Sequence, residues 1–221
     1  MRTWKKLREN PALWERYFVR EKVLTAVRRF FADRKFHEVE TPYLTSDLPP
    51  ESYLEVFETT LLSRDRTPKR VFLPTSPEPF LKKLLVAGIG NCFAIPKSFR
   101  NTEDKSSTHN PEFTILEWYR VEADYMDIMN DCEELLQYIN TYLQRTTDSK
   151  VPMRPTELTY QGKKINLASP WERLSMTEAF LRYASIDLPN SLDLTTMASI
   201  VKKKVYSVSP ADSWEELFHH V

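Results

Sequence analysis

Apolar residues recur at helical spacing in two long stretches of the chain. In residues 15–34 they fall on one face of a helix; they are Val23, Val27, Phe30 and Phe31. A second stripe follows Asp124, which can cap a helix; its members are Ile128, Cys132, Leu135, Leu136, Ile139 and Leu143. We interpret the second stripe as core packing. Another helix is expected from Ser175, which has the spacing of a capping box with Glu178.

Alternating apolar and polar residues predict strands between these helices. Residues 36–44 alternate and include Pro42, which fits a strand end or an edge strand. Residues 55–62 and 91–100 are further strand candidates, and residues 112–121 predict a strand that returns antiparallel to 91–100. The polar, proline-containing residues 145–170 indicate a linker or a surface excursion.

A short strand that begins at Val71 leads into a helix. Ser76 is the expected N-cap, Pro77 suits the first helical position, and Gly88 suits the C-terminal cap. Glu78 then lies in the first turn, where the helix dipole stabilises a negative charge. The pattern alone leaves open whether Glu78 is only a helix-start carboxylate or a ligand-binding group.

The side chains best suited to chemistry lie in residues 98–119. Arg100 can bind a phosphate or a carboxylate in a forked geometry, and Phe113 offers a ring face on which a base can stack. Glu117 and Tyr119 are two residues apart, so on a strand they share a face and can together receive an ammonium group. By spacing alone Tyr119 fits the core equally well, and a loop histidine such as His109 is more often structural or solvated.

The composition limits the class of protein. The chain has 221 residues, of which 41% are hydrophobic, and 31 basic residues balance 31 acidic ones. This size fits one domain or one and part of another, and zero net charge argues against a large nucleic-acid footprint. The basic runs at residues 64–70 and 202–204 are interpreted as solvated surface.

Targeting and redox signals are absent from the sequence pattern. No apolar run approaches the roughly 18 residues of a membrane span, and the first residues lack the apolar core of a signal peptide. Cys92 and Cys132 are too widely spaced to form a disulfide framework or a metal site. We therefore expect a reduced, cytoplasmic protein.

The segment from Phe99 to Tyr119 resembles motif 2 of the class II aminoacyl-tRNA synthetases in its lysyl form. The shared pattern is Phe-Arg-Asn, a loop, and then His-Asn-Pro-Glu-Phe-Thr-x-x-Glu-x-Tyr. Residues 15–44 are similar to motif 1, which builds the dimer interface in that family, and Thr-Ser-Pro-Glu at residues 75–78 also occurs in lysyl-type members. The resemblance implies an α+β fold with a mainly antiparallel sheet flanked by helices, and a homodimer.

The resemblance also implies a site for ATP, with Mg²⁺, and for a lysine-like amino acid. Arg100 is the implied catalytic residue, and no protein metal ligand is assigned. The implied ATP-binding residues are Arg100, Asn101, Thr102, Glu103, His109, Asn110 and Phe113. The implied residues around the amino acid are Ser76, Pro77, Glu78, Glu117 and Tyr119. The family has Arg-x-Glu where this chain has one residue more, so either Glu103 or Thr102 contacts the adenine.

Within that family the chain resembles the stand-alone elongation factor P–(R)-β-lysine ligases, because motif 1 begins almost at the first residue. The implied reaction activates lysine or (R)-β-lysine as an adenylate and transfers it to a lysine of elongation factor P, and tRNA is not expected as a partner. A lysyl-tRNA synthetase-type activity and a non-catalytic binding module are the alternatives. No glycine follows Gly162, so the glycine-containing motif 3 is not found and we expect a truncation before it. The expected domains are a catalytic core over residues 1–145 and a linker and helical region over residues 146–221.

Overall fold

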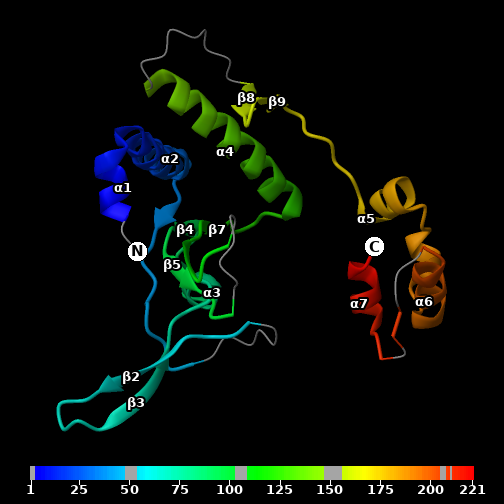
Figure 1. Ribbon diagram of the computed structural model, residues 1–221, viewed down its shortest axis with the longest axis horizontal. Helices are drawn as coiled ribbons and strands as arrows, with labels where there is room; N and C mark the ends of the chain where they lie inside the picture. The colour runs from blue at the N-terminus through cyan, green and yellow to red at the C-terminus, as the bar shows by residue number, and fades with distance from the viewer. Residues whose placement is uncertain (1–2, 48–53, 103–108, 147–155, 205–207, 210) are drawn as a thin grey trace. The chain divides into compact units, whose positions relative to one another are not determined.

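The computed structural model describes residues 3–47, 54–102, 109–146, 156–204, 208–209 and 211–221. The chain forms two compact units, Met1–Ser169 and Pro170–Val221 (Figure 1). The division follows Ser169, whereas we expected a boundary at residue 145. The expected linker contains a hairpin of β8 (Glu157–Tyr160) and β9 (Lys163–Asn166) that is held to the first unit, since the Asn140 amide donates to the Glu157 carbonyl at 3.2 Å.

The first unit is built around a long antiparallel hairpin with one interruption in each arm. The first arm holds β4 (Cys92–Ala94) and β5 (Lys97–Phe99), and the second holds β6 (Glu112–Thr114) and β7 (Glu117–Tyr119). β4 pairs with β7 and β5 with β6 in one continuous register. Pro96 has no N–H to donate, but its carbonyl accepts from Ile115 at 3.2 Å across the interruption. The strands expected at residues 91–100 and 112–121 are therefore confirmed, with a break that the alternation did not show.

A short parallel strand completes this sheet. β1 (His37–Glu38) pairs with β4, so the strand order is β1-β4-β7. We expected a strand over residues 36–44, but the ladder ends after Val39, whose N–H donates to the Phe93 carbonyl at 2.9 Å. Pro42 cannot continue it, and Thr45 bridges to Phe72 instead.

Helices cover both faces of the sheet, as Figure 1 shows. α2 (Trp14–Asp33) and α4 (Tyr125–Thr146) pack on one face, and α3 (Glu78–Val86) packs on the other. The core under α2 and α4 consists of Val27, Phe30, Phe31, Phe36, Phe93 and Leu135. Phe31 is its centre, because its ring lies 4.7 Å from that of Phe93 and 5.5 Å from that of Trp118. The α+β architecture expected from the sequence is confirmed.

The helix boundaries confirm some capping predictions and correct one. Asp124 accepts from the Met126 N–H at 2.7 Å at the start of α4, and Gly88 follows α3 with a φ of +88° that glycine tolerates. Ser76 was expected to cap α3, and this is wrong: the residue before the helix is Pro77, and the Ser76 hydroxyl has no hydrogen-bond partner among the described residues. Glu78 does lie in the first turn.

The stripe on α4 is core only in part. Leu135 is buried, with 6% of its surface exposed, and belongs to the core cluster. Leu136, which the pattern also assigned to the core, is 45% exposed. One residue along a helix turns the side chain by about 100°, which is enough to leave the buried face.

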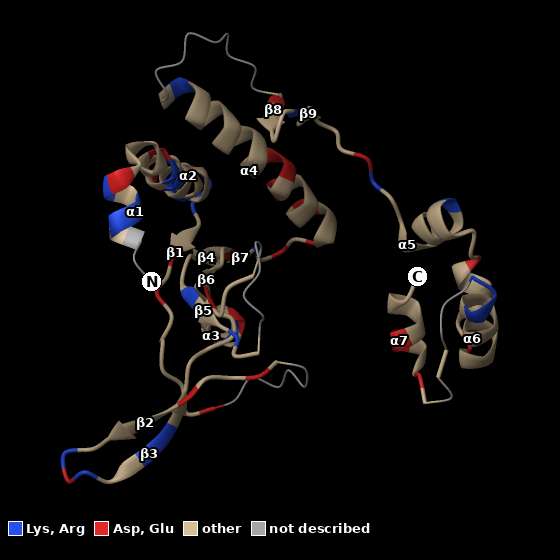
Figure 2. Ribbon diagram, viewed as in Figure 1, with Lys and Arg blue, Asp and Glu red and all other residues tan. Residues whose placement is uncertain are grey.

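The remaining elements of the first unit are exposed over most of their length, but Leu7 of α1 and Val71 and Phe72 of β3 are buried. α1 (Thr3–Glu9) and η1 (Pro11–Leu13) precede α2, and β2 (Glu58–Leu62) and β3 (Pro68–Phe72) form a separate hairpin. In Figure 2 the blue of Lys and Arg marks the ribbon near the turn and along β3 of this hairpin. The basic run at residues 64–70 was expected to be a solvated loop; it is exposed, but its last three residues belong to β3.

The second unit is helical and has a core of its own. Its elements are α5 (Met176–Ala179), η2 (Phe180–Ala184), η3 (Leu188–Ser191), α6 (Leu194–Lys203) and α7 (Trp214–His219). Its buried side chains are Phe180, Ile186, Leu188, Met197, Val201 and Leu217. The capping box predicted at Ser175 and Glu178 is confirmed, because each side chain bonds to the backbone N–H of the other.

No helix in the described ranges is long and apolar enough to cross a membrane.

Candidate active site

The register of the long hairpin decides which side chains share a face. Paired residues of an antiparallel ladder point to the same side, and successive residues alternate. Phe93 pairs with Trp118 and both face the core under α2. Cys92 pairs with Tyr119, and both pack around Leu81 of α3.

The residues singled out from the sequence fall on the α3 side of this hairpin. Glu117 and Tyr119 of β7 share that side with Phe113 of β6, because all three have the same parity along one register. Arg100 follows β5, and its backbone N–H donates to the Pro111 carbonyl at 2.9 Å, which extends the same ladder. The Arg100 guanidinium carbon lies 5.3 Å from the Phe113 ring centroid, so the expected phosphate ligand and the expected base platform are neighbours.

A cavity of about 390 Å³ brings three of the expected amino-acid ligands together. Glu78 enters from the first turn of α3, and Glu117 and Tyr119 enter from β7. The complete lining is Glu78, Lys82, Leu116, Glu117, Trp118, Tyr119 and Ile128. The polar side chains of the lining are two carboxylates, a phenol, one ammonium and the Trp118 indole, beside Leu116 and Ile128. Leu116 and Trp118 also pack against the core under α2, so the cavity is not confined to the α3 side of β7.

The two carboxylates act on the same tyrosine. Burial raises the pKa of Tyr119 far above its usual range, and the negative charges of Glu117 and Glu78 raise it further, as does the hydrogen bond between Tyr119 and Glu117. The Tyr119 hydroxyl therefore stays neutral and can donate a hydrogen bond. A site with these groups is suited to bind an organic cation.

The other expected ATP ligands are at the surface. Asn101, Thr102, His109 and Asn110 are exposed. Asn101 is held toward residues 55–56, since its N–H donates to the Glu55 carbonyl at 3.0 Å and its amide to the Val56 carbonyl at 3.4 Å. Glu103 lies outside the described residues, so the choice between Thr102 and Glu103 as the adenine contact stays a prediction.

Two buried hydroxyls beside the site were missed by sequence reasoning. Thr75 and Ser98 are 1% and 0% exposed, and like Ser76 their hydroxyls have no hydrogen-bond partner among the described residues. The Phe99 N–H donates to the Pro74 carbonyl at 2.9 Å, which joins the two segments. A buried hydroxyl without a partner costs about 1–3 kcal/mol, so these groups favour a polar ligand or water nearby. The sequence could have indicated Ser98, because it precedes Arg100 by two residues and residues two apart on a strand share a face.

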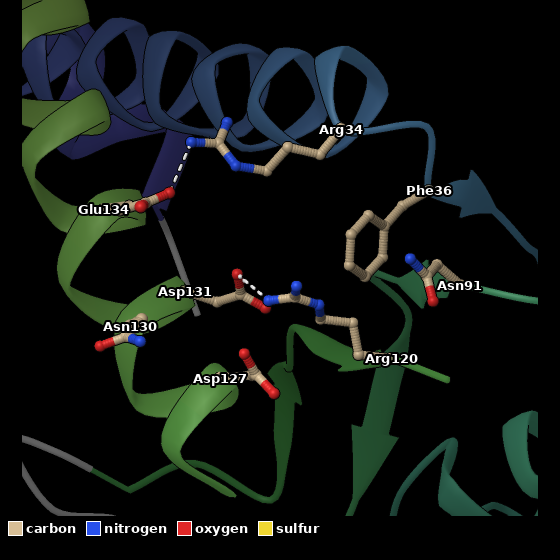
Figure 3. A pocket seen from close by; sticks show the side chains of 8 residues that line it. All are labelled: Arg34, Phe36, Asn91, Arg120, Asp127, Asn130, Asp131 and Glu134. Atoms are coloured by element: carbon tan, nitrogen blue, oxygen red, sulfur yellow. Dashed lines mark hydrogen bonds and ion pairs between the residues drawn. The ribbon is translucent and has the colours of Figure 1, made fainter. Parts of the chain in front are cut away.

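A second cavity, of about 410 Å³, lies on α4 and contains none of the expected site residues (Figure 3). Four of its five charged side chains pair with one another: Arg34 with Glu134 at 2.7 Å, and Arg120 with Asp131 at 3.0 Å; the fifth is Asp127. These pairs tie α4 to the end of α2 and to the residue that follows β7. We interpret the cavity as part of the framework rather than as the active site.

No group of three or more His, Cys, Asp or Glu side chains that could hold a metal ion occurs in the described part of the chain. Cys92 is buried, Cys132 is half-buried, and both are thiols.

Comparisons with known proteins identify the family of the chain. Residues 2–209 match the family model described as tRNA synthetases class II (D, K and N). The chain is 37% identical over 178 residues to the lysine–tRNA ligase of Psychrobacter arcticus, which covers 80% of the chain and 32% of that protein. It is 34% identical over 214 residues to the lysine–tRNA ligase of Pelotomaculum thermopropionicum, which covers 96% of the chain and 40% of that protein.

A third relative gives the same result. The lysine–tRNA ligase of Legionella pneumophila strain Corby is 38% identical over 167 residues, covering 76% of the chain and 31% of that protein. The chain thus spans between 31% and 40% of the length of these curated relatives. The resemblance of motif 2 to lysyl-type synthetases is confirmed as far as the family and its lysine–tRNA ligase relatives. The chain belongs to the class II tRNA synthetase family of the D, K and N type.

Proposed function

We propose that the chain forms the part of a ligase that activates lysine, or (R)-β-lysine, as an adenylate. The observation that carries the proposal is the position of Glu78, Glu117 and Tyr119 in one cavity, on the same side of the hairpin as Arg100 and Phe113. Two carboxylates match the two ammonium groups of a lysine-like molecule. The names of the relatives, all lysine–tRNA ligases, support the same amino acid.

The proposed step is displacement at the α-phosphate of ATP. A carboxylate oxygen of the amino acid forms a bond to the α-phosphorus, the bond from that phosphorus to the bridging oxygen breaks, and pyrophosphate leaves. Arg100 holds the carboxylate and the α-phosphate together, so it lowers the repulsion between two anions and stabilises the charge of the transition state. Phe113 stacks on the adenine. Ser76 and Pro77, which were also expected around the amino acid, precede Glu78 in the chain but are not among the residues that line the cavity.

Mg²⁺ accompanies the phosphates of ATP in this proposal and neutralises part of their charge. Because the described residues contain no cluster of metal-binding side chains, we expect phosphate oxygens and water to supply most of its ligands. No step is assigned to protein-bound metal.

The test is ATP–pyrophosphate exchange with lysine, with (R)-β-lysine and without amino acid. We expect exchange with one of the two amino acids and a loss of about 10²-fold in Arg100→Ala, which is typical for removal of a charge-stabilising donor. Arg70→Ala is the matched control, because Arg70 is an exposed arginine on β3 that pairs with Glu58. Undiminished exchange in Arg100→Ala from folded protein would refute its role, and no exchange with either amino acid would leave a binding module as the better description.

The acceptor of the activated amino acid is a separate proposal. We propose a lysine side chain of elongation factor P, because the zero net charge of these 221 residues argues against a large tRNA-binding surface on them. tRNA is the second candidate, since the relatives are lysine–tRNA ligases. Transfer of radiolabelled lysine to purified elongation factor P or to tRNA distinguishes the two, and label on tRNA alone would refute the first.

A homodimer through α1 and α2 completes the proposal. Trp4, Trp14 and Phe18 are exposed there, and the rings of Trp14 and Phe18 stack at 6.5 Å. Large exposed apolar patches mark interaction sites. We expect Phe18→Asp to convert a dimer to a monomer in analytical ultracentrifugation, while Leu136→Ser, on the exposed side of α4, leaves it a dimer; a monomeric wild-type protein would contradict the proposal.

A further inference from the structure

A lysine of the protein itself occupies one carboxylate of the candidate amino-acid cavity. Glu78 and Lys82 are one helical turn apart on α3, and the Lys82 ammonium forms an ion pair with the Glu78 carboxylate. Both side chains line the cavity together with Glu117 and Tyr119. The ammonium of Lys82 is thus bound where we propose that the amino acid places an ammonium of its own.

We propose that Lys82 is an internal competitor for the ammonium site of Glu78 and must leave it before the amino acid binds. The proposal rests on the proposed function, because it concerns the same cavity. Two ammonium groups at one carboxylate repel each other, so both cannot use Glu78 at full strength. Lys82 can leave without damage to the fold, because its side chain is 60% exposed and its four-carbon stem can turn to solvent.

The charges of the cavity explain what such a competitor does. Without Lys82, the carboxylates of Glu78 and Glu117 would face each other across a partly buried site, and both act on the Tyr119 hydroxyl. With Lys82 in place, one of them is neutralised until a ligand arrives. A ligand with one ammonium that displaces Lys82 replaces one ion pair at Glu78 with another. A ligand with two ammonium groups also forms a second ion pair, with Glu117. Lys82 therefore lowers, by the same factor, the affinity of every amine that must place an ammonium at Glu78, whereas a monoamine that binds at Glu117 avoids the competition.

The expected size of the effect follows from the exposure of the pair. Ion pairs this accessible are weak, so release of Lys82 should cost the ligand a factor of about two to five in affinity. Lys82→Met removes the ammonium and keeps the length of the side chain. Lys83→Met is the matched control, because Lys83 is the next residue on the same helix, is also exposed, and lies outside the cavity lining.

The experiment is isothermal titration of the 221-residue protein and both variants with lysine, with 1,5-diaminopentane and with a monoamine, n-pentylamine. We expect Lys82→Met to bind lysine and the diamine about two- to fivefold more tightly than the wild type, and to bind the monoamine with no larger gain, because a monoamine can bind at Glu117 without displacing Lys82. Lys83→Met should match the wild type. In pyrophosphate exchange, Lys82→Met should lower KM for lysine without raising kcat, a change that a merely structural role on α3 would not produce.

Unchanged or weaker binding in Lys82→Met overturns the inference, and so does an equal gain in Lys83→Met. The result is separable from the proposed function, because the affinities are measured without ATP. Tighter amine binding in Lys82→Met without exchange in any protein would uphold the competitor and refute adenylate formation. Absence of binding of all three amines to all three proteins would overturn both.

Discussion

Two adjacent leucines on α4 give the most direct test of the fold. Leu135 and Leu136 belong to the same apolar stripe of the sequence, but Leu135 is 6% exposed and packs with Phe30 and Phe31, whereas Leu136 is 45% exposed. Leu→Ala at each position removes the same atoms from the same helix. The difference between the two variants therefore measures burial alone.

The magnitudes follow from the two environments. A Leu→Ala change removes apolar atoms worth about 0.8 kcal/mol for each buried CH₂ group, and in a packed core the cavity adds to this loss. We expect Leu135→Ala to lower the free energy of unfolding of the first unit by about 3 kcal/mol. At Leu136 roughly half of the transfer term applies and solvent fills the space, so the loss should be about 1 kcal/mol.

Hydrogen exchange of the β7 and α4 amides at increasing urea reports the first unit without interference from the second. Circular dichroism checks that both variants keep their helix content. Equal losses within about 0.5 kcal/mol, or a larger loss for Leu136→Ala, would mean that α4 does not present the face described, since measured losses track burial.

Three further predictions concern a titration, a buried ion pair and a cap. The raised pKa of Tyr119 means that the folded state favours the neutral phenol. Its contribution to stability is therefore complete below the unfolded pKa of about 10 and is lost as the pH rises above it. Between about pH 9 and pH 11 the melting temperature of the wild type should therefore fall more than that of Tyr119→Phe. Arg120→Ala leaves the Asp131 carboxylate, 6% exposed, without its cation and should lower the free energy of unfolding by about 2 kcal/mol in urea titration, whereas Arg70→Ala should change it little. Ser175→Ala removes the hydroxyl that accepts from the Glu178 N–H but keeps the bond from the backbone N–H of residue 175 to the Glu178 carboxylate. It should lower the free energy of unfolding of the second unit by about 1 kcal/mol, seen as faster exchange of the α5 amides; an unchanged rate would contradict the capping role.

The sequence predicted most elements of the first unit because their signals are local. Asp124 and Gly88 mark helix ends through their own conformations, and the alternation in residues 112–121 exposes the two faces of a strand. The errors arose where tertiary contacts decide the outcome. Leu136 has helical spacing but lies on the exposed side of α4. β1 ends at Glu38 with one further ladder bond from Val39, and the chain then reaches Phe72 through the bridge at Thr45.

The candidate site shows the same division. Glu117 and Tyr119 could be assigned to one face from their spacing, and Arg100 and Phe113 from the motif, because one register carries all four. The contribution of α3 could not be derived this way, since no spacing along a strand predicts which helix covers it. Lys82 had a visible signal, four residues after Glu78, but its importance depends on the cavity that Glu78 shares with β7.

The long hairpin explains why core and site cannot be altered independently. Phe93 and Trp118 on one face pack against Phe31, and Glu117 and Tyr119 on the other line the cavity, so each strand segment serves both with adjacent residues. A rotation of β7 that relieved strain in the core would turn the Glu117 carboxylate away from Glu78. Two carboxylates select a diamine best when the distance between them is fixed. A flexible pair would have to become ordered on binding, and this loss of conformational entropy would weaken the affinity. The dense aromatic packing around Phe31 therefore stabilises the fold and at the same time holds the spacing on which selection of a lysine-like ligand depends.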